Sequence, residues 1–374
     1  MGDDRFSSTS YTRTREETAK DGGATKKAEQ RHKEGKPLNE LVDPAGFNAT
    51  RRSKNRFTES GNMLVLACGI AMLKESRFDT TSSMGNSVDL AFDSLPKSYH
   101  LLAEGDHAVL GRYDTQIITA IFGDRVDKYI LQRSQAEMNN KIAEQMTMMV
   151  PERGGGDYTE DPQYGIFSAA YLTAATINQY GLKSYDFTTT DADSREKVSP
   201  DGLRRVFGPE VFARLKENGF EMNENDLPEL TQMVKDLKKR AHAFLICIGS
   251  EAHSFWQDFY GKQHVILLED ARLLAETEAA IIGLTEGNLT LSTLEKFLTK
   301  DAGLTSHEAE TIKRAVAHIP IGAQMALPGF DKIPLKGAMF AKKDDLWPTE
   351  NAGEKPAPEK EKDKTKEKKK AMWD

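Results

Sequence analysis

Short apolar runs alternate with amphipathic stretches through the central part of this chain. Runs rich in β-branched and aromatic residues predict strands at 117–122, 182–190, 243–248 and 264–268. Strands that alternate with helices at this spacing predict a doubly wound α/β fold, in which helices cover both faces of a mostly parallel central sheet. The intervening helical patterns lie at about 88–102, 135–149, 164–180, 200–218 and 227–240.

The pattern does not decide which segment forms the first strand of the sheet. The apolar run at residues 63–72 fits either a buried strand or a buried helix, because periodicity does not separate the two. It leads into the tetrapeptide KESR, which is more polar than a central parallel strand usually is. Further along, the segments 117–122 and 126–131 are joined by a Gly-Asp turn, which predicts a hairpin and therefore one antiparallel edge strand.

Changes in composition mark the boundaries of the predicted domains. Both ends of the chain are polar and charged, with too little apolar surface to offset the entropy lost on ordering. Within the N-terminal arm, residues 38–42 are predicted to form a short docking segment. We expect a disordered arm at 1–45, a central α/β domain at 46–270 with a helical insertion at about 200–240, a helical extension at 271–340 and a disordered charged tail at 341–374.

Composition and charge indicate a globular protein and give little support for a nucleic-acid-binding or membrane protein. The 374 residues are 38% hydrophobic, enough for a sizeable core, and the net charge of -7 gives no reason to expect nucleic acid as a partner. The two cysteines, Cys68 and Cys247, lie in apolar runs, which indicates buried free thiols in a reducing compartment. The sequence has neither a signal-peptide pattern nor an apolar run of about 20 residues, so we expect a cytoplasmic protein that does not enter a membrane.

The segment that carries candidate chemistry is Asp79-Thr-Thr-Ser-Ser83. Asp79, Thr81 and Ser83 alternate along the chain, so in an extended turn their oxygen atoms point the same way. One carboxylate and two hydroxyls suit Mg²⁺ better than zinc, which prefers nitrogen and sulfur ligands. The same residues before a helical pattern also fit an N-terminal capping sequence, whose side-chain oxygens accept hydrogen bonds from free backbone N–H groups.

Two more oxygen-rich segments lie near predicted strands. The glycine-rich acidic loop at 151–162 contains Asp157 and Thr159, and the predicted strand at 182–190 is followed by Asp191. The carboxyl ends of parallel strands meet at one edge of a sheet, where ligands bind in doubly wound folds. We therefore expect these side chains near Asp79.

Four segments in order resemble the von Willebrand factor A (VWA) family. DTTSSMG is similar to that family's metal-ion-dependent adhesion site motif, Asp-x-Ser/Thr-x-Ser. ITAIFGD with VDKYILQ resembles its second strand and antiparallel edge strand, GGGDYTEDPQYGIFSAA its second metal loop, and YDFTTTDAD the strand before its third. The resemblance covers roughly residues 60–270. More closely, AIFGD, RGGGDYTED and AAIIGLTEG resemble VWA-like proteins of phage and bacterial genomes.

The resemblance implies a set of metal ligands. Asp79 would hold Mg²⁺ or Mn²⁺ directly or through a water, Thr81 and Ser83 would coordinate through their hydroxyls, and Asp191 would act as an outer-sphere carboxylate. In the family a threonine of the second loop adds an oxygen, and here either Asp157 or Thr159 stands near that position. A carboxylate there would raise the affinity for a divalent cation and weaken the binding of an acidic ligand.

The function implied by the resemblance is metal-dependent protein binding without catalysis. The cation keeps one open coordination position, which an Asp or Glu of a partner protein fills.

Two other functions remain open from the sequence. Asp191-Ala-Asp193 also resembles the nucleophile motif of haloacid dehalogenase phosphatases, in which one Asp attacks phosphorus and the second acts as acid and base beside Mg²⁺. The late position of this motif in the sheet argues against a phosphohydrolase. The third possibility is a structural assembly protein whose metal site is vestigial.

Overall fold

The structure is a computed structural model. It describes residues 25–45, 64–65, 71–104, 107–137, 141–156 and 159–333. Cys68, the predicted ligand Asp157 and the predicted tail at 341–374 lie outside the described residues, as does the first part of the predicted N-terminal arm.

A six-stranded sheet forms the centre of the fold, and it confirms the predicted doubly wound class. The strand order is β10-β9-β7-β2-β3-β4, and every neighbouring pair is parallel except β3 with β4. Numbered along the chain within this sheet, the order is 3-2-1-4-5-6, which is a common doubly wound arrangement. The strands are β2 (Ala71–Asp79), β3 (Asp114–Phe122), β4 (Leu131–Arg133), β7 (Ser184–Thr190), β9 (Ala241–Ile248) and β10 (Val265–Leu268).

The first strand of this sheet is the polar segment. Strand β2 contains the whole KESR sequence and lies in the middle of the sheet, between β3 and β7. The sequence left strand and helix open for 63–72, and the structure places the beginning of the strand at Ala71.

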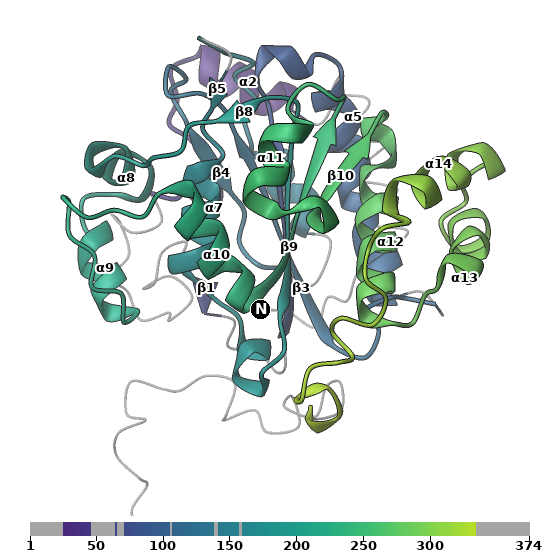
Figure 1. Ribbon diagram of the computed structural model, residues 1–374. Helices are drawn as coiled ribbons and strands as arrows, with labels where there is room; N and C mark the ends of the chain where they lie inside the picture. Colours follow the sequence, from purple (N-terminus) through teal and green to yellow (C-terminus); the bar gives the residue numbers. More distant parts are fainter. Residues whose placement is uncertain are drawn as a thin grey trace, which may run out of the picture.

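Helices cover both faces of the sheet (Figure 1). One core contains Trp256 and Leu245 and lies under α7 (Gln163–Tyr171), α10 (Leu230–Arg240) and α11 (His253–Tyr260). The other core contains Phe187 and Phe244 and lies under α5 (Ser87–Ser94), α12 (Leu274–Glu286) and α14 (Ser306–Val316). Further helices in this part of the chain are α6 (Lys141–Met146), α8 (Pro200–Phe207), α9 (Val211–Glu217) and α13 (Leu291–Lys296).

The helices after residue 270 share the core of the sheet. Every residue of α12 is buried, and its apolar side chains belong to the same cluster as Phe187 on β7. The predicted helical extension at 271–340 is helical as far as Val316, and its described part then continues in turns up to a 3-10 turn at Phe330–Lys332. Helices α12 and α14 of this region pack on the core of the sheet.

The bounds of one predicted strand and one predicted helix differ from those in the structure. The predicted strand at 126–131 is a loop followed by β4, because the Asp127 carboxylate accepts a hydrogen bond from the Asp124 N–H at 2.8 Å and fixes a turn. The predicted helix at 164–180 ends at Tyr171. It is followed by β6 (Thr173–Ala174), which pairs with β1 (Leu64–Val65), and by a 3-10 turn (Thr176–Tyr180).

The N-terminal region differs from the expected disorder where it is described. Residues 25–45 contain α2 (Lys26–Lys33), and Leu38 and Val42 are buried. The Arg133 N–H donates to the Val42 carbonyl at 2.9 Å, so the predicted docking segment adds a backbone contact at the edge strand.

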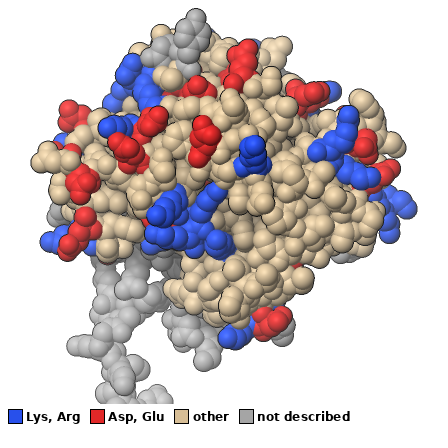
Figure 2. Space-filling model, viewed as in Figure 1, with Lys and Arg blue, Asp and Glu red and all other residues tan. Residues whose placement is uncertain are grey.

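The surface carries charges of both signs. Figure 2 shows acidic and basic side chains interspersed over one face of the molecule. Among the residues that the structure describes, no helix has both the length and the apolar character needed to cross a membrane.

Candidate metal centre

The candidate site lies where the winding of the fold changes direction. After β2 the chain continues through α5 on one face of the sheet, whereas after β7 it continues through α10 on the other. Such a reversal opens a crevice at the carboxyl ends of two adjacent parallel strands. Asp79 is the last residue of β2, and Asp191 directly follows β7.

Hydrogen bonds join four of the predicted ligands into one cluster. Asp79 Oδ1 accepts from the Thr81 hydroxyl at 2.7 Å, and the Thr81 and Ser83 hydroxyls are 3.1 Å apart. The Ser83 hydroxyl donates to Asp191 Oδ1 at 2.9 Å, across 108 residues of sequence. Thr190, which the sequence analysis did not select, donates its hydroxyl to Asp79 Oδ2 at 2.6 Å.

The hydroxyls of this motif do not cap the following helix. Helix α5 begins at Ser87, and its N-cap residue Asn86 makes no side-chain capping bond. Thr81 precedes a 3-10 turn (Ser82–Met84) without a side-chain capping bond there either. The capping interpretation holds for Asp79, whose Oδ1 accepts a hydrogen bond from the Thr81 N–H at 2.9 Å. It does not explain the Thr81 and Ser83 hydroxyls, which contact carboxylates.

The glycine-rich second loop is hydrogen-bonded to the first loop, which follows Asp79. The Ser82 N–H donates to the Gly154 carbonyl at 2.8 Å. A Cβ atom on Gly154 would lie 1.7 Å from Asp127 Oδ1, so glycine lets this loop pass close to the Asp127 carboxylate. Thr159 lies on β5 (Thr159–Glu160), which pairs in parallel with β8 (Asp193–Ser194). This pairing places Thr159 opposite Asp193 and binds the second loop to the third.

Two carboxylates that the sequence analysis missed lie in the same region. Glu160 is 3% exposed, and its Oε2 atom has no hydrogen-bond partner. Asp124, which follows β3, is 0% exposed, and its Oδ2 accepts from the Gly156 N–H at 2.9 Å. The run DYTED did signal an acidic loop, but its spacing does not tell which carboxylate faces Asp79.

The site is short of positive charge. Burial raises the pKa of Asp79 to about 7, although hydrogen bonds from Thr190 and Thr81 oppose this increase. Burial, and then the charges of Asp79 and Asp124, raise the pKa of Glu160 to about 8. Burial also raises the pKa of Asp191. A bound cation would stabilise the ionised form of all these carboxylates.

Among the described residues, the guanidinium of Arg195 lies nearby and forms ion pairs with two other acids, and its charge also lowers the pKa of Glu160, by less than burial raises it. Arg195 Nη1 is 2.8 Å from Asp161 Oδ2 and 3.1 Å from Asp124 Oδ1.

The oxygen set fits a hard cation such as Mg²⁺, which accepts carboxylate and hydroxyl ligands. Within the described ranges, no three or more His, Cys, Asp or Glu side chains form a group that holds a metal. A cation at this site would therefore depend on the hydroxyls of Thr81 and Ser83 as well as on carboxylates.

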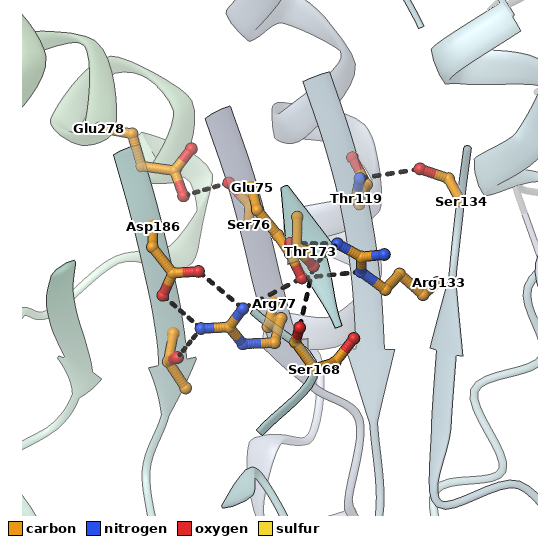
Figure 3. A network of polar contacts seen from close by, with 11 residues as sticks. Glu75, Ser76, Arg77, Thr119, Arg133, Ser134, Ser168, Thr173, Asp186 and Glu278 are labelled. Carbon is orange, nitrogen blue, oxygen red and sulfur yellow. Dashed lines mark hydrogen bonds and ion pairs between the residues drawn. The ribbon is translucent and has the colours of Figure 1, made fainter. Parts of the chain in front are cut away.

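A second buried polar cluster occupies the middle of β2 (Figure 3). Arg77 Nη1 donates to Asp186 Oδ2 at 2.8 Å and to Glu75 Oε1 at 3.0 Å. Arg133 Nη2 donates to Glu75 Oε2 at 2.6 Å and to the Thr173 hydroxyl at 2.9 Å. Two arginines thus balance two carboxylates, which explains how a central strand accommodates the KESR segment.

Helix α7 leaves room for this network. A Cβ atom on Gly165 would lie 2.3 Å from Arg77 Cδ, so glycine lets the buried guanidinium pass under the helix. On the opposite face of the strand, Lys74 Nζ lies 2.5 Å from Glu278 Oε2 of α12.

The two aspartates of the phosphatase-like motif have different surroundings. Asp191 accepts the Ser83 hydroxyl, whereas Asp193 lies on β8 and is paired through its backbone with Thr159.

Comparison with protein-family models found no match, and comparison with curated proteins found no significant match.

Proposed function

We propose that this chain is a VWA-like domain that binds Mg²⁺ or Mn²⁺ at the carboxyl ends of β2 and β7 and, through the cation, an Asp or Glu of a partner protein. The observation that carries the proposal is the hydrogen-bonded cluster of Asp79, Thr81, Ser83 and Asp191. These residues hold the positions that the family resemblance assigns to metal ligands.

Two further observations support the proposal. The 3-2-1-4-5-6 strand order with an antiparallel third strand agrees with the order of motifs in the resemblance. The Asp79 carboxylate is buried and forms no ion pair with a cation of the described residues. A divalent cation would supply the missing positive charge.

Each side chain has a defined part in this proposal. Asp79, which is 0% exposed, and the two hydroxyls would hold the cation. Ser83 is exposed and Asp191 is partly exposed, so the ligand set opens to solvent on their side. The partner carboxylate would approach from that side. Mg²⁺ supplies a Lewis-acidic centre for the carboxylate, and no bond is broken.

The proposal includes a cytoplasmic location. The buried free thiol of Cys247 supports a reducing compartment. The charge balance supports a protein partner over nucleic acid.

Thermal unfolding with and without Mg²⁺ or Mn²⁺ tests the metal site. At roughly 100 times its Kd, a cation that binds only the folded protein stabilises it by about 2.7 kcal/mol. The shift should be present in the wild type and absent in Asp79→Asn, which keeps the size of the side chain. Asp201→Ala is the control, because Asp201 is almost fully exposed on α8 and should keep the shift.

Equal shifts in the wild type and Asp79→Asn, or no shift in the wild type, would refute the metal site. Turnover of an aryl phosphate that is lost in Asp191→Asn would instead favour the phosphohydrolase. Binding of acetate to the Mn²⁺-loaded protein, with loss of one water from Mn²⁺, would support a carboxylate ligand.

A further inference from the structure

The described N-terminal region encloses a cavity against the α/β domain. The cavity has a volume of about 170 Å³ and lies between α2 with residues 36–39 on one side and Tyr129, Thr147, Met148 and Val150 on the other. One enclosed water needs about 10–15 Å³, so the cavity has room for a ligand of roughly ten non-hydrogen atoms.

The wall that α2 contributes is basic. Lys27, Ala28, Arg31 and His32 recur at the three- and four-residue spacing that places side chains on one face of a helix, and this face lines the cavity. Lys36 adds a further cation. None of the described residues that line the cavity is an Asp or Glu, so its lining favours an anion.

The end of α2 brings Arg31 and Lys36 together. Gly35, with a φ of 73°, reverses the chain after the helix. The Lys36 N–H donates to the Arg31 carbonyl at 3.0 Å, and the Gly35 N–H donates to the His32 carbonyl at 2.8 Å. These bonds form a Schellman motif, in which the positions of Arg31 and Lys36 often carry apolar residues in contact. Two cations stand there instead, and an anion between them would relieve their repulsion.

The acids near the cavity neutralise only part of this charge. Glu34 Oε2 lies 2.6 Å from Lys36 Nζ, and Glu152 Oε2 lies 3.8 Å from His32 Nε2. The Arg31 guanidinium forms no ion pair and no hydrogen bond with the residues that the structure describes. Its donors are therefore available to a ligand.

The opposite wall is mainly apolar. Tyr129, Met148 and Val150 line it, and the Tyr129 ring packs edge-on against His32 with 5.6 Å between ring centroids. Glu152 holds this wall by accepting the Tyr129 N–H at 2.6 Å. A ring attached to an anionic group would bury apolar surface against this wall.

We propose that the cavity is a binding site for a small organic anion, in which Arg31 and Lys36 hold a carboxylate or phosphate group and Tyr129 and Met148 contact an attached ring. A guanidinium group offers paired N–H donors that match either kind of anion. The inference is independent of the proposed metal site, because none of these residues is a predicted metal ligand.

Titration of the full chain with phenylphosphonate in a metal-free buffer, read by ligand-observed NMR, tests the site. We expect binding that weakens as salt is added, because Arg31 and Lys36 are exposed to solvent. Benzoate should compete for the site, whereas the neutral benzamide should not. Methylphosphonate should bind at least about fivefold more weakly than phenylphosphonate, because it lacks the ring.

Arg31→Gln should weaken the binding of phenylphosphonate by at least about tenfold, because it removes charge-assisted hydrogen bonds. Lys33→Gln is the matched control. Lys33 lies in the same last turn of α2 and is exposed, but it does not line the cavity, so this variant should bind as the wild type does. Circular dichroism confirms that both variants are folded.

Three results would overturn the proposal. The first is a wild type that binds neither phenylphosphonate nor benzoate. The second is equal weakening in Arg31→Gln and Lys33→Gln, which would show that α2 attracts anions only through its overall charge. The third is competition by benzamide as strong as that by benzoate, which would make the cavity an apolar pocket. A loss confined to Arg31→Gln supports the proposal, and no result in metal-free buffer bears on the metal site.

Discussion

Strand β2 carries two groups of buried charges on the same face, and they differ in how the charges are balanced. In the middle of the strand, burial alone would raise the pKa of Glu75, but Arg133 and Arg77 hold it below its usual value. At the end of the strand, burial raises the pKa of Asp79 to about 7. Both carboxylates are buried, so the difference comes from the neighbouring cations.

This difference separates a structural cluster from a candidate binding site. The network of Glu75, Arg77, Arg133 and Asp186 supplies its own counter-charges (Figure 3). At the edge of the sheet, Glu160 keeps an unpaired oxygen atom, and the described residues offer it no full counter-charge. A buried carboxylate cluster without a full counter-charge, placed where strand ends meet, is a candidate binding site.

The largest effect is expected from breaking the balanced network. Arg77→Leu should lower the free energy of unfolding by about 3–5 kcal/mol, because it leaves the carboxylates of Glu75 and Asp186 buried without their shared cation. Denaturant unfolding measures this loss. Lys197→Ala is the control, because the ion pair between Lys197 and Glu229 is also short, at 2.9 Å, but is exposed. Its unfolding midpoint should hardly change, and a loss as large as that of Arg77→Leu would contradict the comparison.

A pH-dependent effect is expected at a buried carboxyl group with hydroxyl partners. Glu286 accepts hydrogen bonds from Tyr185 at 2.7 Å and Tyr113 at 2.8 Å, and burial raises its pKa from 4.5 to about 7. The folded state therefore holds the proton more tightly than the unfolded state does. This contribution to stability is fully present below pH 4.5 and is lost as the pH rises through about 7.

Glu286→Gln should remove this part of the pH dependence, since the amide does not ionise. The difference in unfolding free energy between the variant and the wild type should change by on the order of 3 kcal/mol from acid to pH 8, in favour of the variant at high pH. Denaturant unfolding at several pH values measures it. Parallel profiles for the two proteins would show that Glu286 does not hold the proton.

The smallest effect on stability is expected at the open side of the candidate site. Ser83 is exposed, so Ser83→Ala should change the free energy of unfolding by less than about 0.5 kcal/mol. The loss of one ligand oxygen should weaken Mn²⁺ binding by on the order of 1 kcal/mol, about fivefold. Titration with Mn²⁺ measures this change. A large loss of stability with unchanged Mn²⁺ binding would assign Ser83 to the structure instead of the site.

The fold class was predictable because apolar residues recur with a different period in strands than in helices. The apolar strands β3, β7, β9 and β10 lie close to their predicted positions. The antiparallel edge strand was predicted too, although Asp127 moves it to Leu131–Arg133 by fixing the preceding turn. The end of helix α7 was not predictable from the periodic pattern, which indicated a helix to residue 180. The helix ends before Thr173, whose hydroxyl accepts a hydrogen bond from Arg133 on another strand.

Part of the candidate site was predictable because loops at strand ends meet at one edge of a parallel sheet. The order of segments alone placed Asp191 near Asp79, and the hydrogen bond from Ser83 to Asp191 joins the two loops. Glu160 was not predictable. Its direction depends on the pairing of β5 with β8, two residues on each side, and so short a pairing leaves no periodic signal in the sequence.

The sequence by itself determined the alternation of strands and helices and the candidate oxygen atoms of Asp79, Thr81, Ser83 and Asp191, because these depend on local spacing. Only the tertiary structure decided which polar groups have partners. Arg77 lies on β2 and Asp186 on β7, so their pairing depends on the order of strands in the sheet. The same order brings Asp79 at the end of β2 beside Thr190 of β7, whose hydroxyl is its partner, because the partners of a buried charge depend on distances between segments remote in the chain.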